Sequence, residues 1–464
     1  MKIAKGIFII FTALSLQSCF VAKEYSRPEN SVDESLYRTD QLSTDSLSMA
    51  TISWREIFTD EILQDYIEEG LENNMDIRIG LQQINIAEAY LRQGKAAYFP
   101  TLNAQAVAMH QEFSESSQYG GQISSINQFE LSGALSWEAD IWGKIRSNER
   151  AANAVYLQSV AAHRAVKSRL VANIASVYYQ LLALDEQIKI TEETIATRTK
   201  SLETTKALKE AGSVTEVGVK QTEAQLYNAQ SILVNLKEQS KLLENTLAIL
   251  LGSSPQEFER NSLEEQEIDV PLTIGVPTDL LSNRPDVMAA EYELIQAFEL
   301  TNVARSNFYP SLTLSASGGL QALEIDKLFD ANSLFASVIG GLTQPIFNGR
   351  RFKTQYEVSQ AQQEQAFLRF KNTLLVAGKE VSDALVAIQT AEQIISLKEN
   401  ENDAYQLSVD YSMELLNNGF ANYLEVLTAE ERALASGLEM IAAQNARLQS
   451  IVNLYRALGG GWID

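Results

Sequence analysis

The chain has 464 residues, of which 60 are acidic and 37 are basic, and its formal net charge is −23. This negative charge argues against a nucleic-acid binder, which needs a basic face to displace counterions from phosphates. The chain has 2 His and 1 Cys and contains no glycine-rich phosphate loop or hydrolase motif. We therefore expect no catalytic residue, no metal site and no cofactor.

The N-terminus has the features of a secretion signal. Lys2 and Lys5 precede an apolar run from Gly6 to Leu16, which is too short to span a membrane and is typical of a signal peptide. The following residues, LQSC, resemble a bacterial lipobox, whose cysteine becomes lipidated. We expect a signal peptide over residues 1–18, a lipid such as palmitate on Cys19, and a lipid-anchored segment over residues 19–55. The alternative is an ordinary cleavage site beside an unmodified cysteine.

Two strands are predicted in the first half of the chain. A helical pattern stops at Pro100, and the segment that follows it, TLNAQA, begins a strand over about residues 100–113. Residues 128–140 alternate clearly, with Phe129, Leu131 and Leu135 on one face and Glu130 and Ser132 on the other. Segments of about ten alternating residues are typical of transmembrane β-barrels.

Long helices follow these strands. No proline occurs between Pro100 and Pro255, and apolar residues recur there at seven-residue intervals, as in Ile174, Leu181, Ile188 and Ile195. A sustained heptad predicts helices that pack along neighbouring helices. The first helix runs from about Gly143 to Gly212, which corresponds to a length of roughly 100 Å. Gly212 can cap it in the left-handed conformation, so a helical hairpin with its tip near residue 212 is expected.

The second half of the chain repeats this pattern. The prolines before the first strands are separated by 310 − 100 = 210 residues, and the tip glycines by 419 − 212 = 207. We therefore predict two tandem repeats, residues 56–260 and 261–464. The second contains strands at about 310–321 and 334–347 and a hairpin with its tip near residue 419. The last strand is apolar, and its alternation is ambiguous.

Four strands cannot close a barrel on their own. An open strand edge in lipid leaves unpaired backbone groups, each costing several kcal/mol. Two chains would supply 2 × 4 = 8 strands and three would supply 3 × 4 = 12. Because eight-stranded barrels are filled by side chains, a conducting pore favours three chains.

Five motifs resemble one known family. They are YSRP from Tyr25, WREIF from Trp54, GLENNMDI from Gly70, VPTDLLSNRPDV from Val276 and LYRALGGGW from Leu454. In this order they resemble TolC-like outer-membrane efflux factors, of the lipoprotein branch that serves resistance-nodulation-division pumps. The resemblance implies a mainly α-helical homotrimer with a 12-stranded transmembrane β-barrel that continues into a periplasmic α-helical barrel. It implies a passive exit duct in the outer membrane for drugs or other small molecules, with no enzymatic activity.

The resemblance also implies partners and site residues. A periplasmic adaptor protein would link the duct to an inner-membrane pump, and outer-membrane lipid would surround the strands. The adaptor would contact the hairpin tips, at Gly212, Ser213, Val214, Thr215, Gly419, Phe420, Ala421 and Asn422. The periplasmic constriction of the family falls on Leu424, Thr428 and Glu431. Leu424 matches the family, whereas Thr428 and Glu431 replace an Asp and an Arg that recur in some members.

The acidic residues near this constriction suggest a hypothesis. Glu425, Glu430 and Glu431 could form a ring of carboxylates in a trimer, and such rings attract cations. The alternative is a solvated acidic face on the outside of the helical barrel.

Three other functions remain open at this point. A lipid-anchored coiled-coil protein without a pore would lack the amphipathic strands. A periplasmic adaptor would fold back on one hairpin instead of repeating in tandem. A duct for type I protein secretion belongs to the same family, and the lipobox and the GGGW ending favour small-molecule efflux only by analogy.

Overall fold

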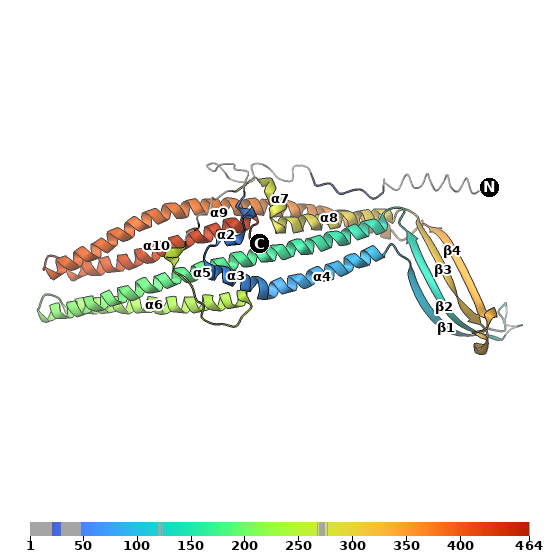
Figure 1. The fold of residues 1–464 in the computed structure, drawn as a ribbon, viewed down its shortest axis with the longest axis horizontal. Helices are drawn as coiled ribbons and strands as arrows, with labels where there is room; N and C mark the ends of the chain where they lie inside the picture. Colours follow the sequence, from blue (N-terminus) through green and yellow to red (C-terminus); the bar gives the residue numbers. More distant parts are fainter. Residues whose placement is uncertain are drawn as a thin grey trace. The chain divides into compact units, whose positions relative to one another are not determined.

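The computed structural model covers residues 21–28, 48–118, 124–266 and 277–463, together with the single residues 122, 268, 274 and 275. The expected signal peptide and lipidated Cys19 lie outside these described residues. The helices and strands of the first half are α2 (Trp54–Ile57), α3 (Glu61–Asn73), α4 (Met75–Ala96), β1 (Thr101–Glu112), β2 (Ser125–Ala139), α5 (Lys144–Glu210) and α6 (Glu216–Leu251). Those of the second half are α7 (Leu280–Asn283), α8 (Pro285–Ser306), β3 (Ser311–Ala322), β4 (Leu334–Thr343), α9 (Arg351–Asn417) and α10 (Tyr423–Leu458) (Figure 1).

The order of elements recurs in the two halves. α5 and α9 each contain 67 residues, and α6 and α10 each contain 36. The starts of the long helices are separated by 351 − 144 = 207 residues, and those of the return helices by 423 − 216 = 207. The chain is thus mainly helical, with one small antiparallel sheet.

The heptad rows lie inside the helical packing. Ile174 and Leu181 of α5 are fully buried, whereas Ile188 and Ile195 of the same row are only partly buried. On α10, a row with the same spacing, Leu427, Leu434, Ile441 and Leu448, is buried throughout. The seven-residue spacing keeps these side chains on the face that meets neighbouring helices, as predicted. Among the described helices, none is both long and apolar enough to cross a membrane.

The sheet is a single layer in the order β1-β2-β3-β4, and all its pairs are antiparallel (Figure 1). One row of directly paired residues reads Leu102, Leu135, Ala316 and Val338, and the row beside it reads Thr101, Ser136, Ser315 and Ile339. Directly opposed residues share a face of a sheet, so the first row lies on an apolar face and the second on a mainly polar face. The ambiguous alternation of β4 arises because it places apolar residues on both faces.

β4 ends earlier than expected. The sequence predicts a strand to about residue 347, whereas β4 stops at Thr343. Pro345 lies just beyond this end and has no amide proton to donate to a neighbouring strand. The following residues form the turn that leads into α9.

The chain divides into two compact units, and α4, α5, α8 and α9 contribute to both. One unit contains Ile84–Ser159 and Ala290–Phe370, and hence the sheet, together with residues 21–28. These residues, which we call the N-terminal strap, lie along α8. The guanidinium of Arg27 forms two hydrogen bonds of 2.7 Å to the carboxylate of Glu291. Lys23 exchanges two backbone hydrogen bonds with the side-chain amide of Asn302.

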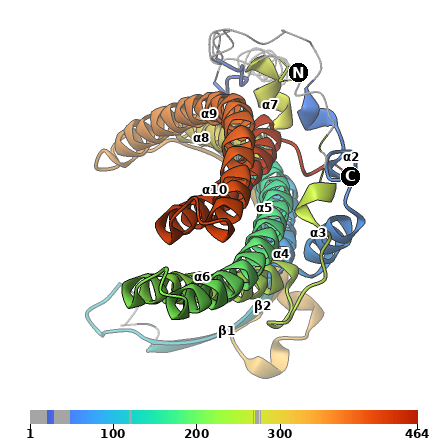
Figure 2. The ribbon, with the colours of Figure 1, turned by 90° about the vertical axis from the view of Figure 1, so that its left-hand side faces the viewer.

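The other unit contains Asn30–Gln83, Val160–Ala289 and Lys371–Asp464. Figure 2 shows its two helical hairpins, α5 with α6 and α9 with α10. An aromatic cluster fills part of its core, where the ring of Phe58 contacts Tyr179 and Tyr455. Phe58 belongs to the WREIF segment, in which Trp54 and Ile57 are also buried. The conspicuous aromatic and aliphatic residues of this motif are therefore core residues.

A buried arginine ties the second half of this unit together. Arg284, from the RPDV segment, is 4 % exposed. Its guanidinium pairs with Asp286 and Glu380, both at 2.7 Å, and donates a hydrogen bond to the carbonyl of Ala457 at 3.0 Å. Charge-assisted hydrogen bonds of this kind fix the planar guanidinium in one geometry. The motif thus holds the start of α8 against the end of α10.

Candidate functional site

The candidate site lies at the tip of the second hairpin. α9 ends at Asn417 and α10 begins at Tyr423, and Gly419 between them has a φ of 75°. The amide of Phe420 donates to the carbonyl of Leu415 at 2.8 Å, which closes the C-terminus of α9. The side chain of Asn422 then caps α10 by accepting hydrogen bonds from the amides of its first turn. The glycine allows the left-handed backbone that this turn requires.

The first hairpin turns in the same way at Gly212, whose φ is 76°. Gly212, Ser213 and Thr215 are exposed, and Val214 is half-buried. In the second tip, Gly419, Phe420 and Asn422 are exposed and Ala421 is half-buried. The hydroxyl of Tyr423 donates to the side-chain carbonyl of Gln221 at 2.9 Å and thereby joins the two tips.

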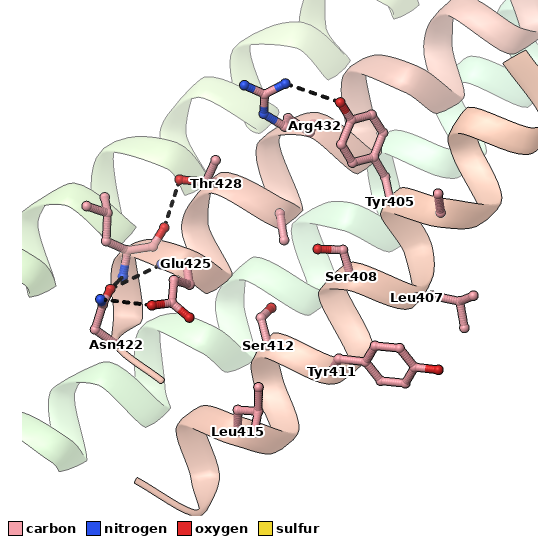
Figure 3. Close-up of a pocket in the computed structure, with 13 residues that line it drawn as sticks. Tyr405, Leu407, Ser408, Tyr411, Ser412, Leu415, Asn422, Glu425, Thr428 and Arg432 are labelled. Atoms are coloured by element: carbon pink, nitrogen blue, oxygen red, sulfur yellow. Dashed lines mark hydrogen bonds between the residues drawn. The ribbon is translucent and has the colours of Figure 1, made fainter. Parts of the chain in front are cut away.

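Two of the three predicted constriction residues lie together. Leu424 and Thr428 line one groove between α9 and α10, and the Thr428 hydroxyl donates to the carbonyl of Leu424 at 2.8 Å (Figure 3). The third, Glu431, is not part of this groove. Its carboxylate accepts a hydrogen bond of 3.3 Å from the side chain of Gln225 on α6.

The groove has a volume of about 800 Å³, and both apolar and polar side chains line it along its length. Tyr405, Tyr411 and Leu415 of α9 form one wall, and Arg432 lies on the α10 side (Figure 3). A guanidinium N–H of Arg432 donates to the hydroxyl of Tyr405 at 3.2 Å, and this hydrogen bond raises the pKa of the arginine. The groove can therefore offer apolar, hydroxyl, carboxylate and cationic groups to whatever lies against it.

Arg432 was not among the predicted site residues, although its spacing from Leu424 and Thr428 places it on the same helix face. Leu424, Thr428 and Arg432 are four residues apart, since 428 − 424 = 4 and 432 − 428 = 4. Residues at i and i+4 lie on one helix face. The family motif predicts the third residue at position 431. In this chain, the side chain of Glu431 is directed toward Gln225 of the neighbouring hairpin.

A buried polar seam joins the two hairpins behind the groove. Glu430 of α10 accepts a hydrogen bond of 2.6 Å from the hydroxyl of Ser201 on α5. Arg198, also on α5, is almost completely buried and donates to the backbone carbonyl of Gln225 at 2.6 Å. Burial raises the pKa of Glu430 and lowers the pKa of Arg198. Among the described residues, Oε2 of Glu430 and Nε of Arg198 have no hydrogen-bond partner.

This seam corrects the hypothesis of a three-carboxylate ring. Glu430 is 4 % exposed and lies inside the protein, so its carboxylate cannot face an open channel. Glu425 is exposed and accepts a hydrogen bond from Asn422, and Glu431 is engaged with Gln225. The three glutamates thus have three different environments, and only Glu425 lines the groove.

No cluster of three or more His, Cys, Asp or Glu side chains that could hold a metal ion occurs among the described residues. His163 is partly buried next to Gly80, and burial lowers its pKa. His110 lies on the sheet and shares a hydrogen bond with Asn127.

A family model supports the assignment of this architecture. The model described as "Outer membrane efflux protein" matches residues 66–253 and 276–460. These two ranges correspond to the two halves of the chain.

Known proteins resemble the chain over nearly its whole length. The solvent efflux pump outer membrane protein SrpC of Pseudomonas putida is 28 % identical, over 98 % of this chain and 97 % of its own. The cation efflux system protein CusC of Escherichia coli O6:H1 is 29 % identical, over 97 % of both chains. The crystal structure of a membrane protein from Pseudomonas aeruginosa is 26 % identical, with a TM-score of 0.87, and covers 95 % of this chain and 100 % of its own.

Proposed function

The chain belongs to the outer membrane efflux protein family, and we propose that three copies of it assemble into one channel. It is an outer-membrane efflux channel that extends into the periplasm, and it is a passive duct of a tripartite pump, not an enzyme. The observation that supports a trimer best is the open, single-layered sheet.

The sheet has two unpaired edges and an uncovered apolar face. β1 pairs only with β2, and β4 pairs only with β3, within the described chain. Unpaired edges in lipid are costly, and closed barrels remove them. If β4 of one copy pairs with β1 of the next, three copies give 3 × 4 = 12 strands in one barrel. The row of Leu102, Leu135, Ala316 and Val338 then faces lipid, and the polar row faces the lumen.

Exposed apolar rows on the long helices support the same assembly. On α6, Tyr227, Val234, Leu242 and Ile249 are all more than half exposed. On α9, Leu375, Val386 and Leu397 are also more than half exposed. Apolar side chains at such regular helical spacing normally pack against another helix. We propose that these rows meet neighbouring copies and extend the barrel as helices into the periplasm.

Duplication explains how one chain supplies its share of the tube. We propose that residues 56–260 and 261–464 are two copies of one unit, each with two strands and one helical hairpin. The identical lengths of the paired long helices and their common offset of 207 residues support this division.

The ends of the strands that adjoin the helices fit a membrane surface. Phe99 is 73 % exposed, and Phe308 and Tyr309 are also exposed beside the start of β3. Aromatic residues gather at the interfaces between membrane and water in β-barrels. We propose that the periplasmic surface of the outer membrane lies at this level.

The N-terminal strap lies close to the start of β3, where a lipid on Cys19 could enter the membrane. The backbone carbonyl of Val21 accepts a hydrogen bond from Arg305, six residues before the start of β3, since 311 − 305 = 6. Cys19 is two residues before Val21 in the sequence, and two extended residues span at most about 7 Å. We propose that Cys19 carries a lipid that enters the membrane beside the strands.

We propose that the hairpin tips contact a periplasmic adaptor protein, which connects them to an inner-membrane pump. The contact residues would be Gly212–Thr215 and Gly419–Asn422, which lie at the exposed turns. The channel constriction would lie beside them at Leu424 and Thr428, with Glu431 attached to the first hairpin. In this position, movement of the tips would change the width of the constriction.

The cargo is proposed to be small molecules or ions. SrpC is named as part of a solvent efflux pump and CusC as part of a cation efflux system. The groove of this chain combines tyrosines, leucines and an arginine, and no metal-binding cluster accompanies it in the described residues.

Planar lipid bilayers test the proposed channel directly. Purified protein added to a bilayer should produce discrete steps of ion conductance without a pump, an adaptor or an energy source. A non-conducting protein that binds membranes would instead support a lipid-anchored structural role. Restored efflux of dyes in cells that lack their own outer-membrane channel would connect the conductance to transport.

A further inference from the structure

The two places where a strand pair leads into a long helix have the same position in the repeats but different chemistry. We call residues 139–147 the first corner and residues 345–353 the second corner, since 345 − 139 = 206 and 353 − 147 = 206. In the first corner, side chains of the corner itself form hydrogen bonds with the backbone. The carboxylate of Asp140 accepts hydrogen bonds from the amides of Ile145 and Arg146, at 2.8 and 3.0 Å. The indole N–H of Trp142 donates to the carbonyl of Pro310 at 2.7 Å.

The second corner has two exposed apolar residues where the first corner has hydrogen-bonding side chains. Ile346 occupies the position of Asp140, since 346 − 140 = 206, and it is 100 % exposed. Phe347 beside it is 90 % exposed. No other large apolar side chain of the described residues is as exposed as these two. Apolar surface of this kind is normally removed from water by a partner or a membrane.

Three cations follow the apolar pair. Arg350, Arg351 and Lys353 are all exposed, in a chain whose net charge is −23. Arg350 has a φ of 67° and pairs with Glu357 at 3.2 Å, but both side chains are largely exposed, so this pair contributes little. Arg351 lies over the ring of Phe352. A recess of about 250 Å³ opens beside Arg351, with Trp142 and Tyr309 on its wall.

We propose that the second corner binds the headgroups of anionic phospholipids in the periplasmic leaflet of the outer membrane. Ile346 and Phe347 enter the acyl region, while Arg350, Arg351 and Lys353 contact phosphate groups. Exposed apolar residues next to Arg and Lys are the pattern of an interfacial membrane anchor. The inference rests on the proposed channel, because it requires that the strands lie in the membrane.

A neighbouring copy of the chain is the other possible occupant, and charge argues against it. In a closed barrel, the end of β4 would lie near the start of β1 in the next chain, because neighbouring strands are antiparallel. The residues there, KAAYFPT from Lys95 to Thr101, contain no carboxylate and carry one further cation. They offer the second corner no ion pair, whereas a lipid phosphate does.

Lipid binding by the purified trimer tests the proposal. Native mass spectrometry measures retention of phosphatidylglycerol and of phosphatidylethanolamine, which differ in net charge. We expect wild-type protein to retain phosphatidylglycerol preferentially. The triple variant R350Q/R351Q/K353Q should bind it at least about tenfold more weakly, because each Lys or Arg near an anionic lipid contributes about fivefold. The triple variant K237Q/K241Q/K398Q, which removes the same charge from the long helices, should bind as wild type does.

Three outcomes would overturn the proposal. The first is equal retention of the two lipids by the wild-type protein. The second is undiminished phosphatidylglycerol binding by R350Q/R351Q/K353Q. The third is loss of the trimer in that variant, which would identify the corner as a contact between copies. Bilayer conductance of the wild-type protein is recorded alongside, so that failure of the channel itself is recognised separately from failure of lipid binding.

Discussion

The carboxyl group of Glu430 lies in the seam between the two hairpins, where it meets the Ser201 hydroxyl but leaves one oxygen without a partner among the described residues. Desolvation disfavours the charged form, which is why the pKa of this group is raised above its ordinary value of 4.5. A carboxyl group with a raised pKa in the folded state stabilises the fold at low pH. That stabilisation is lost as the pH rises from about 4.5 through the higher folded-state value.

Replacement of Glu430 by glutamine should therefore stabilise the protein at neutral pH. The amide keeps an acceptor for Ser201 and removes the charge that burial disfavours. We expect E430Q to melt at a higher temperature than wild type at pH 7.5, and the difference to shrink toward pH 4. The control is the variant E431Q. Because Glu431 is exposed, this variant should melt at the same temperature as wild type. Equal melting temperatures of E430Q and wild type at both pH values would contradict a charged, buried Glu430.

Substitutions at the tip glycine Gly419 distinguish the effect of backbone strain from the effect of side-chain size. A Cβ atom added at Gly419 would meet no atom within 4 Å, so the cost of alanine is limited to the left-handed backbone, about 1–2 kcal/mol. We expect G419A to keep most efflux, whereas G419W should abolish it by projecting into the proposed adaptor contact. G212A and G212W should behave in the same way. Trimers should form in all four variants, as judged by gel filtration. If the tryptophan variants fail to form trimers, the glycines are structural.

At the scale of the strand, the register determines which residues share a face. Leu312 lies opposite Ala139 and Leu342, and its neighbour Thr313 lies opposite Glu138 and Gly341. Spin labels at positions 312 and 313 should therefore have opposite environments in reconstituted protein. We expect the label at 312 to be accessible to oxygen dissolved in lipid and the label at 313 to a water-soluble nickel complex. Equal accessibility at the two positions would refute the assignment of faces.

The long helices and the first three strands are predictable because their signals are local. Proline-free heptads predict α5 and α9, and alternation after Pro100 and Pro310 predicts β1 and β3. The end of β4 was predicted about four residues beyond Thr343, because the apolar residues Ile346 and Phe347 follow it. Pro345, which ends strands, was given less weight than these apolar residues.

The candidate site was less predictable because it depends on contacts between hairpins. Glu430 and Glu431 are adjacent in sequence, and only tertiary packing makes one a buried partner of Ser201 and the other an exposed partner of Gln225. The helical spacing of Leu424, Thr428 and Arg432 was visible in the sequence, but the aromatic wall from α9 was not. That wall is formed by residues that lie on the other helix of the hairpin.

For the whole molecule, a shared barrel requires that the two open edges of the sheet pair between copies. The edges are separated by three strand spacings, or about 14 Å, whereas a disulfide requires Cα atoms within about 7 Å. Cysteines placed on β1 and β4 of one chain therefore cannot bond to each other within that chain. They can bond only where β4 of one copy meets β1 of another.

Cross-linking of these edges is the most direct test of a shared barrel. Paired cysteine substitutions, such as Ala108→Cys on β1 with Ala336→Cys and its neighbours on β4, are oxidised in the membrane and separated on a denaturing gel. Variants with a single introduced cysteine serve as controls. If three copies share one barrel, a covalent ladder that ends at three chains is expected for at least one register. A ladder that ends at two chains, or protein that remains monomeric at every register, would contradict it.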